Sequence, residues 1–313
     1  MIDFSKIKTR SAQGRHNLVT VQSIMPVRQR GMESPDIPEL NELARRILQA
    51  RRDGRPVILF MGAHVIKSGL SGYIIALMKE GFITHVATNG AGTIHDFELA
   101  CLGGTSEHVP TAIEDGTFGM WEETGAWMNA AICRARDEKT GYWRGIAAYM
   151  QDQPDKFPHR DMSIAYQAAQ LGVRATAHVS IGTDIIHQHP AADFAAIGYT
   201  SGEDFKLFAD SVSGLEGGVF LNFGSAVLGP EVFLKALSIS RNLGYAARRI
   251  TTANFDLVDL GDYRCPIGDD DPNYYYRPRK NIVNRPTQNG GTGWHFVLNH
   301  KVSVPALYQL LQG

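Results

Sequence analysis

The stretch Phe82-Ile-Thr-His-Val-Ala-Thr-Asn-Gly-Ala-Gly-Thr-Ile-His-Asp-Phe-Glu98 decides the fold of this chain. A short apolar run with β-branched residues ends at Thr88-Asn-Gly-Ala-Gly92, and Asp96 and Glu98 follow at once. The pattern predicts a buried strand over 83–87, a tight glycine turn and the start of a helix. Such a junction exposes backbone N–H groups at the carboxyl end of a strand, where α/β sheets usually bind ligands.

Strands and helices alternate on both sides of this junction. The apolar run Pro56-Val-Ile-Leu-Phe-Met61 predicts a strand, and residues 70–79 predict a helix, so the segment forms a βαβ unit with parallel strands. The remaining predictions are a mostly helical region over 120–171, strands over 175–182, 218–224 and 250–257, and helices over 38–48, 204–212, 230–242 and 304–311.

These elements predict an α/β fold with a doubly wound, mostly parallel sheet that has helices on both faces. No change in composition marks a domain boundary, so we expect a single domain over 1–313. Residues 1 to about 35 are polar and irregular, which predicts an arm packed on the body or on a partner subunit. Residues 261–293 are rich in Asp, Pro, Asn, Tyr and Gly, which predicts a long late loop.

Composition excludes several classes of protein. The formal net charge is -1, so bulk charge does not favour nucleic acid or an anionic membrane as a partner. The chain has no apolar run of membrane-spanning length, and its N-terminus lacks the apolar stretch of a signal peptide. Cys101, Cys133 and Cys265 form neither a CxxC pair nor a disulfide framework. We therefore expect a cytoplasmic protein that acts on a small molecule.

Four predicted strand ends carry glycine turns, in the order Gly62, Thr88-Asn-Gly-Ala-Gly92, Gly182-Thr-Asp184 and Gly224-Ser-Ala226. A fifth glycine-rich segment, Gln288-Asn-Gly-Gly-Thr-Gly293, precedes the last strand and helix. This order resembles the deoxyhypusine synthase family over roughly residues 55–313. The resemblance implies a Rossmann-like fold, NAD as cofactor and a homo-oligomer, either a dimer or a tetramer. It implies cofactor contacts from Gly62, Thr88, Asn89, Gly90, Gly92, Asp96, Thr183, Gly224, Ser225, Ala226 and Gly291.

The glycine turn matches only part of the dinucleotide fingerprint, since His95 stands where the third glycine would be. From the pattern alone the turn is an ordinary strand-to-helix turn more often than a phosphate site. Asp96 and Glu98 have a second interpretation as well, because acids near a helix N-terminus stabilise it through the helix dipole.

The family's imine-forming lysine has no counterpart here. That lysine follows a Leu-Pro pair, and the residue after Pro230 in this chain is Glu231, which cannot form an imine. Glu231 is a candidate base or a carboxylate for a cationic substrate, and it would also stabilise the first turn of a helix without acting in catalysis. The resemblance therefore favours the fold and NAD binding over deoxyhypusine synthesis itself.

The candidate catalytic residues are Asp184, His187 and Glu231, as acids or bases that move a proton. The candidates for substrate binding are His64, His189, Trp294 and His295, with Lys67 as a further cation near His64. A histidine or lysine at these positions is about as often an ordinary loop residue. Trp294 matches, by resemblance, a tryptophan that lines the family's polyamine site.

We first expect an NAD-dependent transferase or oxidoreductase that acts on a small amine or carbonyl compound. A second hypothesis is a non-catalytic protein that binds NAD or another small ligand on the same fold. A third is a metal-dependent hydrolase, because His187 and His189 would point the same way on an extended chain, with His178 nearby. No third ligand stands at motif spacing, so we assign no metal.

Overall fold

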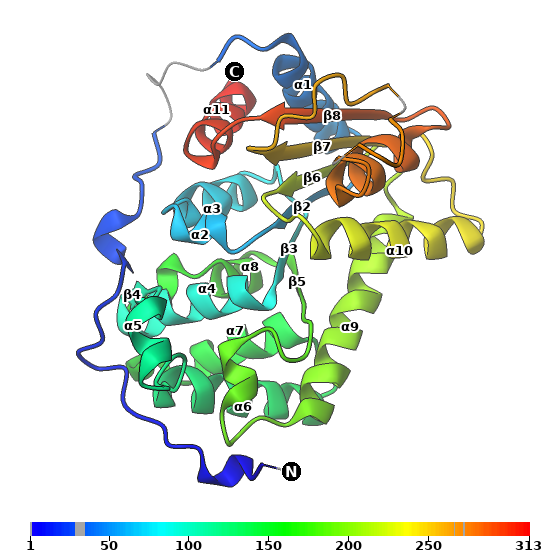
Figure 1. Ribbon diagram of the computed structural model, residues 1–313. Coiled ribbons are helices and arrows are strands. Elements are labelled where there is room, and N and C mark those ends of the chain that lie inside the picture. Colours follow the sequence, from blue (N-terminus) through cyan, green and yellow to red (C-terminus); the bar gives the residue numbers. More distant parts are fainter. Residues whose placement is uncertain (1, 29–34, 266, 272) are drawn as a thin grey trace.

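The core of the protein is a parallel sheet of six strands (Figure 1). The computed structural model describes residues 2–28, 35–265, 267–271 and 273–313. The strands are β2 (Val57–Met61), β3 (His85–Asn89), β5 (Arg174–His178), β6 (Val219–Phe223), β7 (Thr251–Asp256) and β8 (Thr292–Val297). Their spatial order, β5-β3-β2-β6-β7-β8, is the 3-2-1-4-5-6 order of Rossmann folds when these six are numbered along the chain. The structure therefore confirms the predicted fold class.

Eleven α-helices lie among the described residues. They are α1 (Pro38–Arg52), α2 (His64–Lys67), α3 (Ser71–Lys79), α4 (Gly90–Leu102), α5 (Val109–Glu114), α6 (Glu122–Asp137), α7 (Tyr142–Asp152), α8 (Ile164–Leu171), α9 (Phe194–Ser213), α10 (Leu228–Asn242) and α11 (His300–Gln312). None of them is long and apolar enough to cross a lipid bilayer. Shorter 3-10 helices are η1 (Phe4–Lys6), η2 (Val21–Ser23), η3 (Pro154–Lys156), η4 (Arg160–Met162), η5 (Ile185–Gln188) and η7 (Arg285–Thr287).

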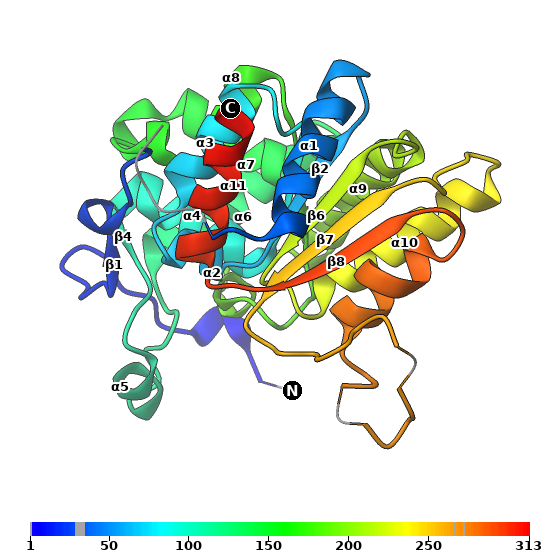
Figure 2. The same cartoon turned by 90° about the horizontal axis from the view of Figure 1, so that it is seen from above.

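Each face of the sheet has its own hydrophobic core, and Figure 2 shows from above the helices that lie on the two sides of the sheet. Leu59 in β2 packs in the core that includes α1, α3 and α11, whereas Ile58 and Phe60 pack with Phe208 of α9 and Phe233 of α10. Successive side chains of a strand point to opposite faces, so a strand covered on both sides must be apolar throughout. This explains why residues 57–61 form an unbroken apolar run.

The N-terminal arm lies along the body of the protein. Its strand β1 (Val19–Thr20) pairs antiparallel with β4 (Gly104–Thr105), and Arg10 N–H donates to the carbonyl of Met120 at 2.9 Å. Figure 1 shows the arm, in dark blue, running past β4 and α5. Met1 and residues 29–34 of the predicted arm lie outside the described residues.

The late segment is more regular than its composition suggested. Where the sequence predicted a loop over 261–293, the structure has a π-helix, η6 (Arg279–Asn284), followed by η7, and β8 begins at Thr292. Ile282 and Val283 are buried against the sheet, and Thr252 of β7 donates its hydroxyl to the Ile282 carbonyl at 2.7 Å. This tertiary packing outweighs the local signals for a loop. Pro266 and Pro272 lie outside the described residues.

The helix after β3 starts earlier than the sequence predicted. α4 begins at Gly90, so the glycine turn is itself the first turn of the helix, and Asn89 caps it by accepting the Gly92 N–H at 2.8 Å. The first turn contains no acid. Asp96 and Glu98 lie beyond it and are buried, so their interpretation as residues that stabilise the helix start was wrong.

The strand order changes direction between β2 and β6. There Gly62 and Gly224 allow the carboxyl ends of these two strands to approach each other closely. Gly62 N–H donates to the carbonyl of Phe223 at 2.8 Å, and a Cβ at Gly62 would collide with the Gly224 carbonyl oxygen. Rossmann folds bind ligands outside this reversal. Gly62 therefore lets the backbone after β2 lie directly against the end of β6 at this reversal.

We predict that Gly62→Ala lowers the free energy of unfolding by about 1–3 kcal/mol, because the new methyl group collides with fixed backbone. Gly198→Ala is the matched control, since Gly198 lies exposed in α9 and a Cβ there meets nothing within 4 Å. We expect this control to raise stability by up to about 1 kcal/mol through helix propensity. Urea unfolding measures both, and equal stability of the two variants would contradict the close contact.

Candidate functional site

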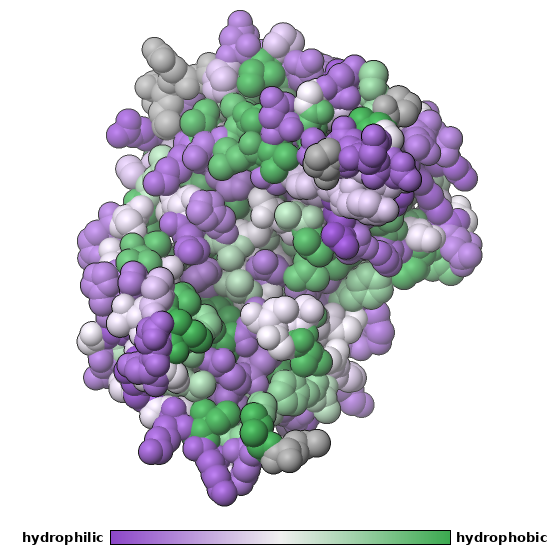
Figure 3. Space-filling model, viewed as in Figure 1, coloured by the Kyte–Doolittle hydropathy of each residue, from purple (hydrophilic) through white to green (hydrophobic). Residues whose placement is uncertain are grey.

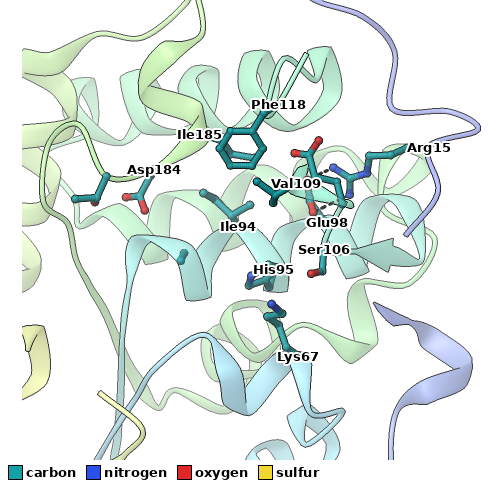
Figure 4. A pocket seen from close by; sticks show the side chains of 13 residues that line it. Arg15, Lys67, Ile94, His95, Glu98, Ser106, Val109, Phe118, Asp184 and Ile185 are labelled. Atoms are coloured by element: carbon teal, nitrogen blue, oxygen red, sulfur yellow. Dashed lines mark hydrogen bonds and ion pairs between the residues drawn. The ribbon is translucent and has the colours of Figure 1, made fainter. Parts of the chain in front are cut away.

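A pocket of about 240 Å³ lies beyond the carboxyl ends of β2, β3 and β5 (Figure 4). Its walls come from the N-terminal arm, α2, α4, the segment 106–118 and the segment after β5. The lining residues are Arg15, Lys67, Ala91, Ile94, His95, Glu98, Ser106, Glu107, Val109, Phe118, Thr183, Asp184 and Ile185. The position agrees with the expectation that ligands bind at this edge of the sheet. Ligand pockets usually enclose about 300–1,000 Å³, so this one suits a small molecule.

The pocket has an apolar middle and polar ends. Figure 4 shows Ile94, Val109, Phe118 and Ile185 between Asp184 on one side and the ion pair of Arg15 and Glu98 on the other. Such a lining favours a substrate with a short carbon chain between polar groups.

Of the three predicted catalytic residues, Asp184 lines the pocket, whereas His187 and Glu231 are not among its lining residues. Asp184 follows β5, is 8% exposed, and packs so tightly on Gly90 at the start of α4 that a Cβ there would overlap its carboxylate. Its Oδ2 atom has no hydrogen-bond partner among the described residues. Burial raises the pKa of Asp184 to about 6. The carboxyl group is therefore poised to exchange a proton near neutral pH.

His187 lies directly behind this carboxylate. The backbone N–H groups of Gly182 and Asp184 donate to its Nδ1 atom at 3.1 Å and 3.3 Å. Nδ1 is therefore an acceptor, so the proton of the neutral ring lies on Nε2, which is 3.8 Å from Asp184 Oδ2. Burial lowers the pKa of His187, which keeps the ring neutral. Because Nε2 has no other partner among the described residues, Asp184 and His187 form a pair that can hold and pass on one proton.

A buried ion pair closes the other end of the pocket. Arg15 of the arm donates two hydrogen bonds of 2.8 Å to Glu98 of α4, and both side chains are at most 3% exposed. Burial disfavours the charged form of Glu98, but hydrogen bonds from Arg15, Thr105 and Thr124 outweigh it and lower the pKa of Glu98. The pair fixes the arm on the body and completes the pocket.

Glu107 lines the same pocket and was not identified from the sequence. Its Oε1 atom accepts the Gly119 N–H at 2.9 Å and the indole N–H of Trp121 at 3.0 Å. Its Oε2 atom is buried and has no partner among the described residues. Such an oxygen suits an ammonium group of a substrate. No local motif marks Glu107, since the contacts come from a segment twelve residues away.

Lys67 and His95 form a further wall, and Figure 4 shows the Lys67 side chain directed toward His95. The Thr105 hydroxyl and His95 Nδ1 are hydrogen-bonded at 2.7 Å. Burial lowers the pKa of His95 to about 4, so this ring is neutral at physiological pH. Lys67 therefore supplies the positive charge at this wall.

Several predicted cofactor residues hold the turn together instead of facing the pocket. The hydroxyl of Thr88 donates to the Met61 carbonyl at 3.0 Å, and Asn89 caps α4 through the Gly92 N–H. Asp96 accepts from the N-terminus of α8, with the Ser163 hydroxyl at 2.7 Å and the Ile164 N–H at 2.7 Å. Burial raises the pKa of Asp96 to about 6. Ala91 of the turn and Thr183 after β5 both line the pocket.

Other predicted residues lie at the reversal between β2 and β6. Within the described part of the chain, no acceptor takes the backbone N–H of Ser225 or Ala226, and Ala226 is exposed. His64 is exposed at the start of α2, with its ring 6.3 Å from that of His300. The His300 ring abuts Gly224, and its Nδ1 atom is buried without a partner among the described residues. This reversal therefore offers free backbone donors, as an anionic group requires.

The remaining candidates lie apart from the pocket. Glu231, in the first turn of α10, forms ion pairs with Lys235 and Arg277. His295 is buried between Asn254 and the Val258 carbonyl. Gly291 and Trp294 line a different cavity at the amino end of β8.

His189 does not lie beside His187 as the metal hypothesis requires. His187 is in the 3-10 helix η5, not in an extended segment, and its Nδ1 faces the backbone. His189 accepts the Ala191 N–H at 3.1 Å and lies 3.4 Å from Glu122. Among the described residues, no three side chains of His, Cys, Asp or Glu are grouped as a metal site requires. The expected shared direction of the two imidazoles was therefore wrong.

Comparison with known proteins supports the fold. No protein-family model and no curated protein matches the sequence. Among solved structures, the chain is similar to a conserved putative LOR/SDH protein from Methanococcus maripaludis S2, with 15% identity and a TM-score of 0.50 over 92% of this chain and 73% of that one. It is also similar to AgrE in a ternary complex with ornithine and NAD+, with 14% identity and a TM-score of 0.50 over 90% of this chain and 34% of AgrE.

A putative deoxyhypusine synthase from Entamoeba histolytica has 10% identity and a TM-score of 0.47, over 87% of this chain and 88% of that one. This chain spans about a third of the length of the first structures it resembles, ArgZ and AgrE. At these identities the structures with a TM-score of 0.50 show a shared fold, and one of them, AgrE, was solved with NAD+.

We predict that Glu98→Gln lowers the free energy of unfolding by about 3–5 kcal/mol, because it leaves the Arg15 charge buried without a counter-charge. The control is Glu138→Gln, which breaks an exposed pair with Arg134. That change should cost less than about 1 kcal/mol. Urea unfolding at pH 7 compares the two, and a loss for Glu98→Gln as small as the control's would contradict the buried pair.

Asp184 should also make stability depend on pH. Its folded-state pKa of about 6 exceeds the ordinary 3.8, so its stabilising contribution is present below about pH 4 and is lost as pH rises through 6. The shift corresponds to about 3 kcal/mol. Wild type should therefore lose more stability than Asp184→Asn between pH 4.5 and pH 7.5. Asp269→Asn, in the exposed late loop, should follow the wild-type profile. Identical profiles for all three proteins would refute the assignment.

Proposed function

We propose that this protein is an NAD-dependent enzyme that oxidises or transfers a small amine- or carbonyl-bearing substrate. The observation that carries the proposal is the pair of Asp184 and His187. At the carboxyl edge of a Rossmann-ordered sheet, a carboxyl with a raised pKa and a neutral imidazole each keep one polar atom, Asp184 Oδ2 and His187 Nε2, without a hydrogen-bond partner among the described residues. Titratable groups perturbed in this way and facing a pocket are typical of acid–base catalysis.

The reversal between β2 and β6 is where NAD would bind. Gly62 and Gly224 themselves place no side chain at this reversal, and the N–H groups of Ser225 and Ala226, free among the described residues, suit a diphosphate. The turn after β2 carries only Gly62 of the three fingerprint glycines, and β3 ends in Asn89 where NAD-binding folds usually have an acid for the ribose. The donors therefore fit the cofactor at the β6 turn better than at the β2 turn. The NAD+ complex of AgrE supports this choice of cofactor.

The pocket determines which substrates fit. Its volume of about 240 Å³ and its apolar middle suit a short aliphatic compound. The free Oε2 of Glu107 would bind an ammonium group, whereas Glu98 is fully engaged by Arg15. A small amine is therefore favoured, as the ornithine bound to AgrE also suggests.

Bound NAD+ supplies a hydride acceptor. The residues of this chain handle the proton: as the C–H bond beside nitrogen or oxygen breaks, Asp184 Oδ2 takes the proton from the N–H or O–H of the substrate. His187 Nε2–H, 3.8 Å away, stabilises the carboxylate before the transfer. The closed pair of Arg15 and Glu98 helps to exclude water from that end of the pocket.

We predict that NAD+ binds the full chain in isothermal titration calorimetry and that Ala226→Glu weakens its binding about tenfold or more, because a carboxylate would face the diphosphate. Ala226 is exposed, so the fold should be unaffected. The matched control is Ala130→Glu at an exposed position of α6, which should bind as wild type does. Absence of NAD+ binding by the wild type would overturn the proposal.

A screen of small amines with NAD+ then tests catalysis by the absorbance of NADH. Turnover should appear in the wild type and fall strongly in Asp184→Asn, with NAD+ affinity unchanged. Binding of NAD+ without turnover of any amine or alcohol would favour the non-catalytic hypothesis.

A further inference from the structure

A second cavity of about 610 Å³ lies under the late loop, at the amino end of β8. It is formed by η6, η7 and the segment 287–294, together with Arg264, Cys265, Ile267 and Tyr274. Gly291 and Trp294, which the sequence had suggested as ligand contacts, lie here. Along β8 the amino and carboxyl ends are about 16 Å apart. The cavity is therefore distinct from the pocket of Asp184.

The cavity is strongly cationic. Four basic residues line it, and none of the described lining residues is acidic; the four are Arg264, Arg279, Lys280 and Arg285. The chain as a whole has a net charge of only -1, so this is a local concentration of charge. In Figure 3 the surface over the late loop and η6, at upper right, is mainly hydrophilic.

Three of the cations of this cavity contact aromatic rings or an amide oxygen, and none of the three forms an ion pair with a carboxylate among the described residues. Lys280 lies over the rings of Tyr274 and Tyr275, at 4.1 Å and 5.1 Å, and Arg264 lies over Tyr263 at 4.8 Å. Arg285 donates to the amide oxygen of Asn281 at 3.1 Å. Within the described residues these charges are therefore held in place but not neutralised.

Arg279 gives the strongest indication that this cavity binds an anion. Its side chain lines the cavity, the residue is 6% exposed, and its Nη2 donates to the Cys265 carbonyl. Its Nε has no acceptor among the described residues. A buried guanidinium remains charged, and burying it without a counter-charge is unfavourable. An anion in the cavity would offset this cost.

Glu231, an acid that contacts η6 through Asn281, already has partners. Glu231 pairs with Lys235 and with Arg277 at 3.0 Å, and it accepts from Asn281 Nδ2 at 3.0 Å. Arg277 is thus neutralised and does not line the cavity, although it is only two residues from Arg279.

We propose that this cavity binds a phosphate-bearing small molecule, with the phosphate held by Arg285 and Lys280 in front of Arg279. Guanidinium groups match phosphate oxygens in geometry and charge, and several cations together suit a group with two negative charges. The organic part would lie against Tyr274 and Trp294, which also line the cavity. The volume lies within the usual range of about 300–1,000 Å³ for small-ligand sites. This site goes beyond the proposed function and does not depend on it.

The test is calorimetric titration of pyrophosphate into the full chain at constant ionic strength. We expect saturable binding that Arg285→Gln and Arg279→Gln each weaken about tenfold or more. Arg277→Gln, the matched control, should leave the affinity unchanged. If Arg279→Gln does not fold, Arg285→Gln still tests the proposal, because Arg285 is exposed and its substitution should leave the fold intact. Absence of saturable binding, or equal losses in Arg277→Gln and Arg285→Gln, would overturn the proposal.

Two further comparisons identify the site and the class of ligand. Ala226→Glu should leave intact the binding that Arg285→Gln weakens. Pyrophosphate binding that Ala226→Glu abolishes and Arg285→Gln leaves unchanged would place the phosphate at the reversal between β2 and β6 and refute the inference. Citrate at the same ionic strength should bind more weakly than pyrophosphate. Equal or tighter binding of citrate would refute phosphate as the ligand class.

Discussion

The close packing of Asp184 against Gly90 is the contact on which the candidate site depends. Only a residue without a side chain at position 90 lets the segment after β5 lie directly on the start of α4. The contact buries the Asp184 carboxyl, beside which the 3-10 helix η5 places His187 at 3.8 Å. It leaves one carboxyl oxygen and one imidazole nitrogen without partners among the described residues. Burial then raises the pKa of the acid and lowers that of the imidazole, and these are the properties that acid–base chemistry needs.

The sequence predicted the fold because its signals are local. Apolar runs of strand length, such as residues 57–61, and glycines at the strand ends place each strand and turn. The long helix α9 was predicted only over 204–212, whereas it begins at Phe194. Its first ten residues include Gly198, Gly202 and β-branched residues, which lower local helix propensity. Burial of Ala196 and Ile197 in the core that includes α6 supplies the missing stability.

The site was harder to predict because its residues come from distant segments. Asp184 and His187 were identified, since they follow a strand directly. Arg15, Glu98 and Glu107 meet only through tertiary packing, so no spacing in the sequence connects Arg15 with Glu98. The cofactor contact expected from Gly90 could not be settled from the sequence. A glycine after a strand is needed both where a ligand approaches the backbone and where another side chain of the protein does. Here the side chain of Asp184 occupies that space.

The pKa of Asp184 tests the proposed site most directly, and carboxyl ¹³C NMR of aspartate-labelled protein measures it. The resonance missing from the spectrum of Asp184→Asn identifies the group. We expect it to titrate with a pKa of about 6, because burial disfavours its charged form. A pKa at or below the ordinary 3.8 would mean that the carboxylate is solvated or paired, and it would contradict the acid–base pair at the centre of the proposed site.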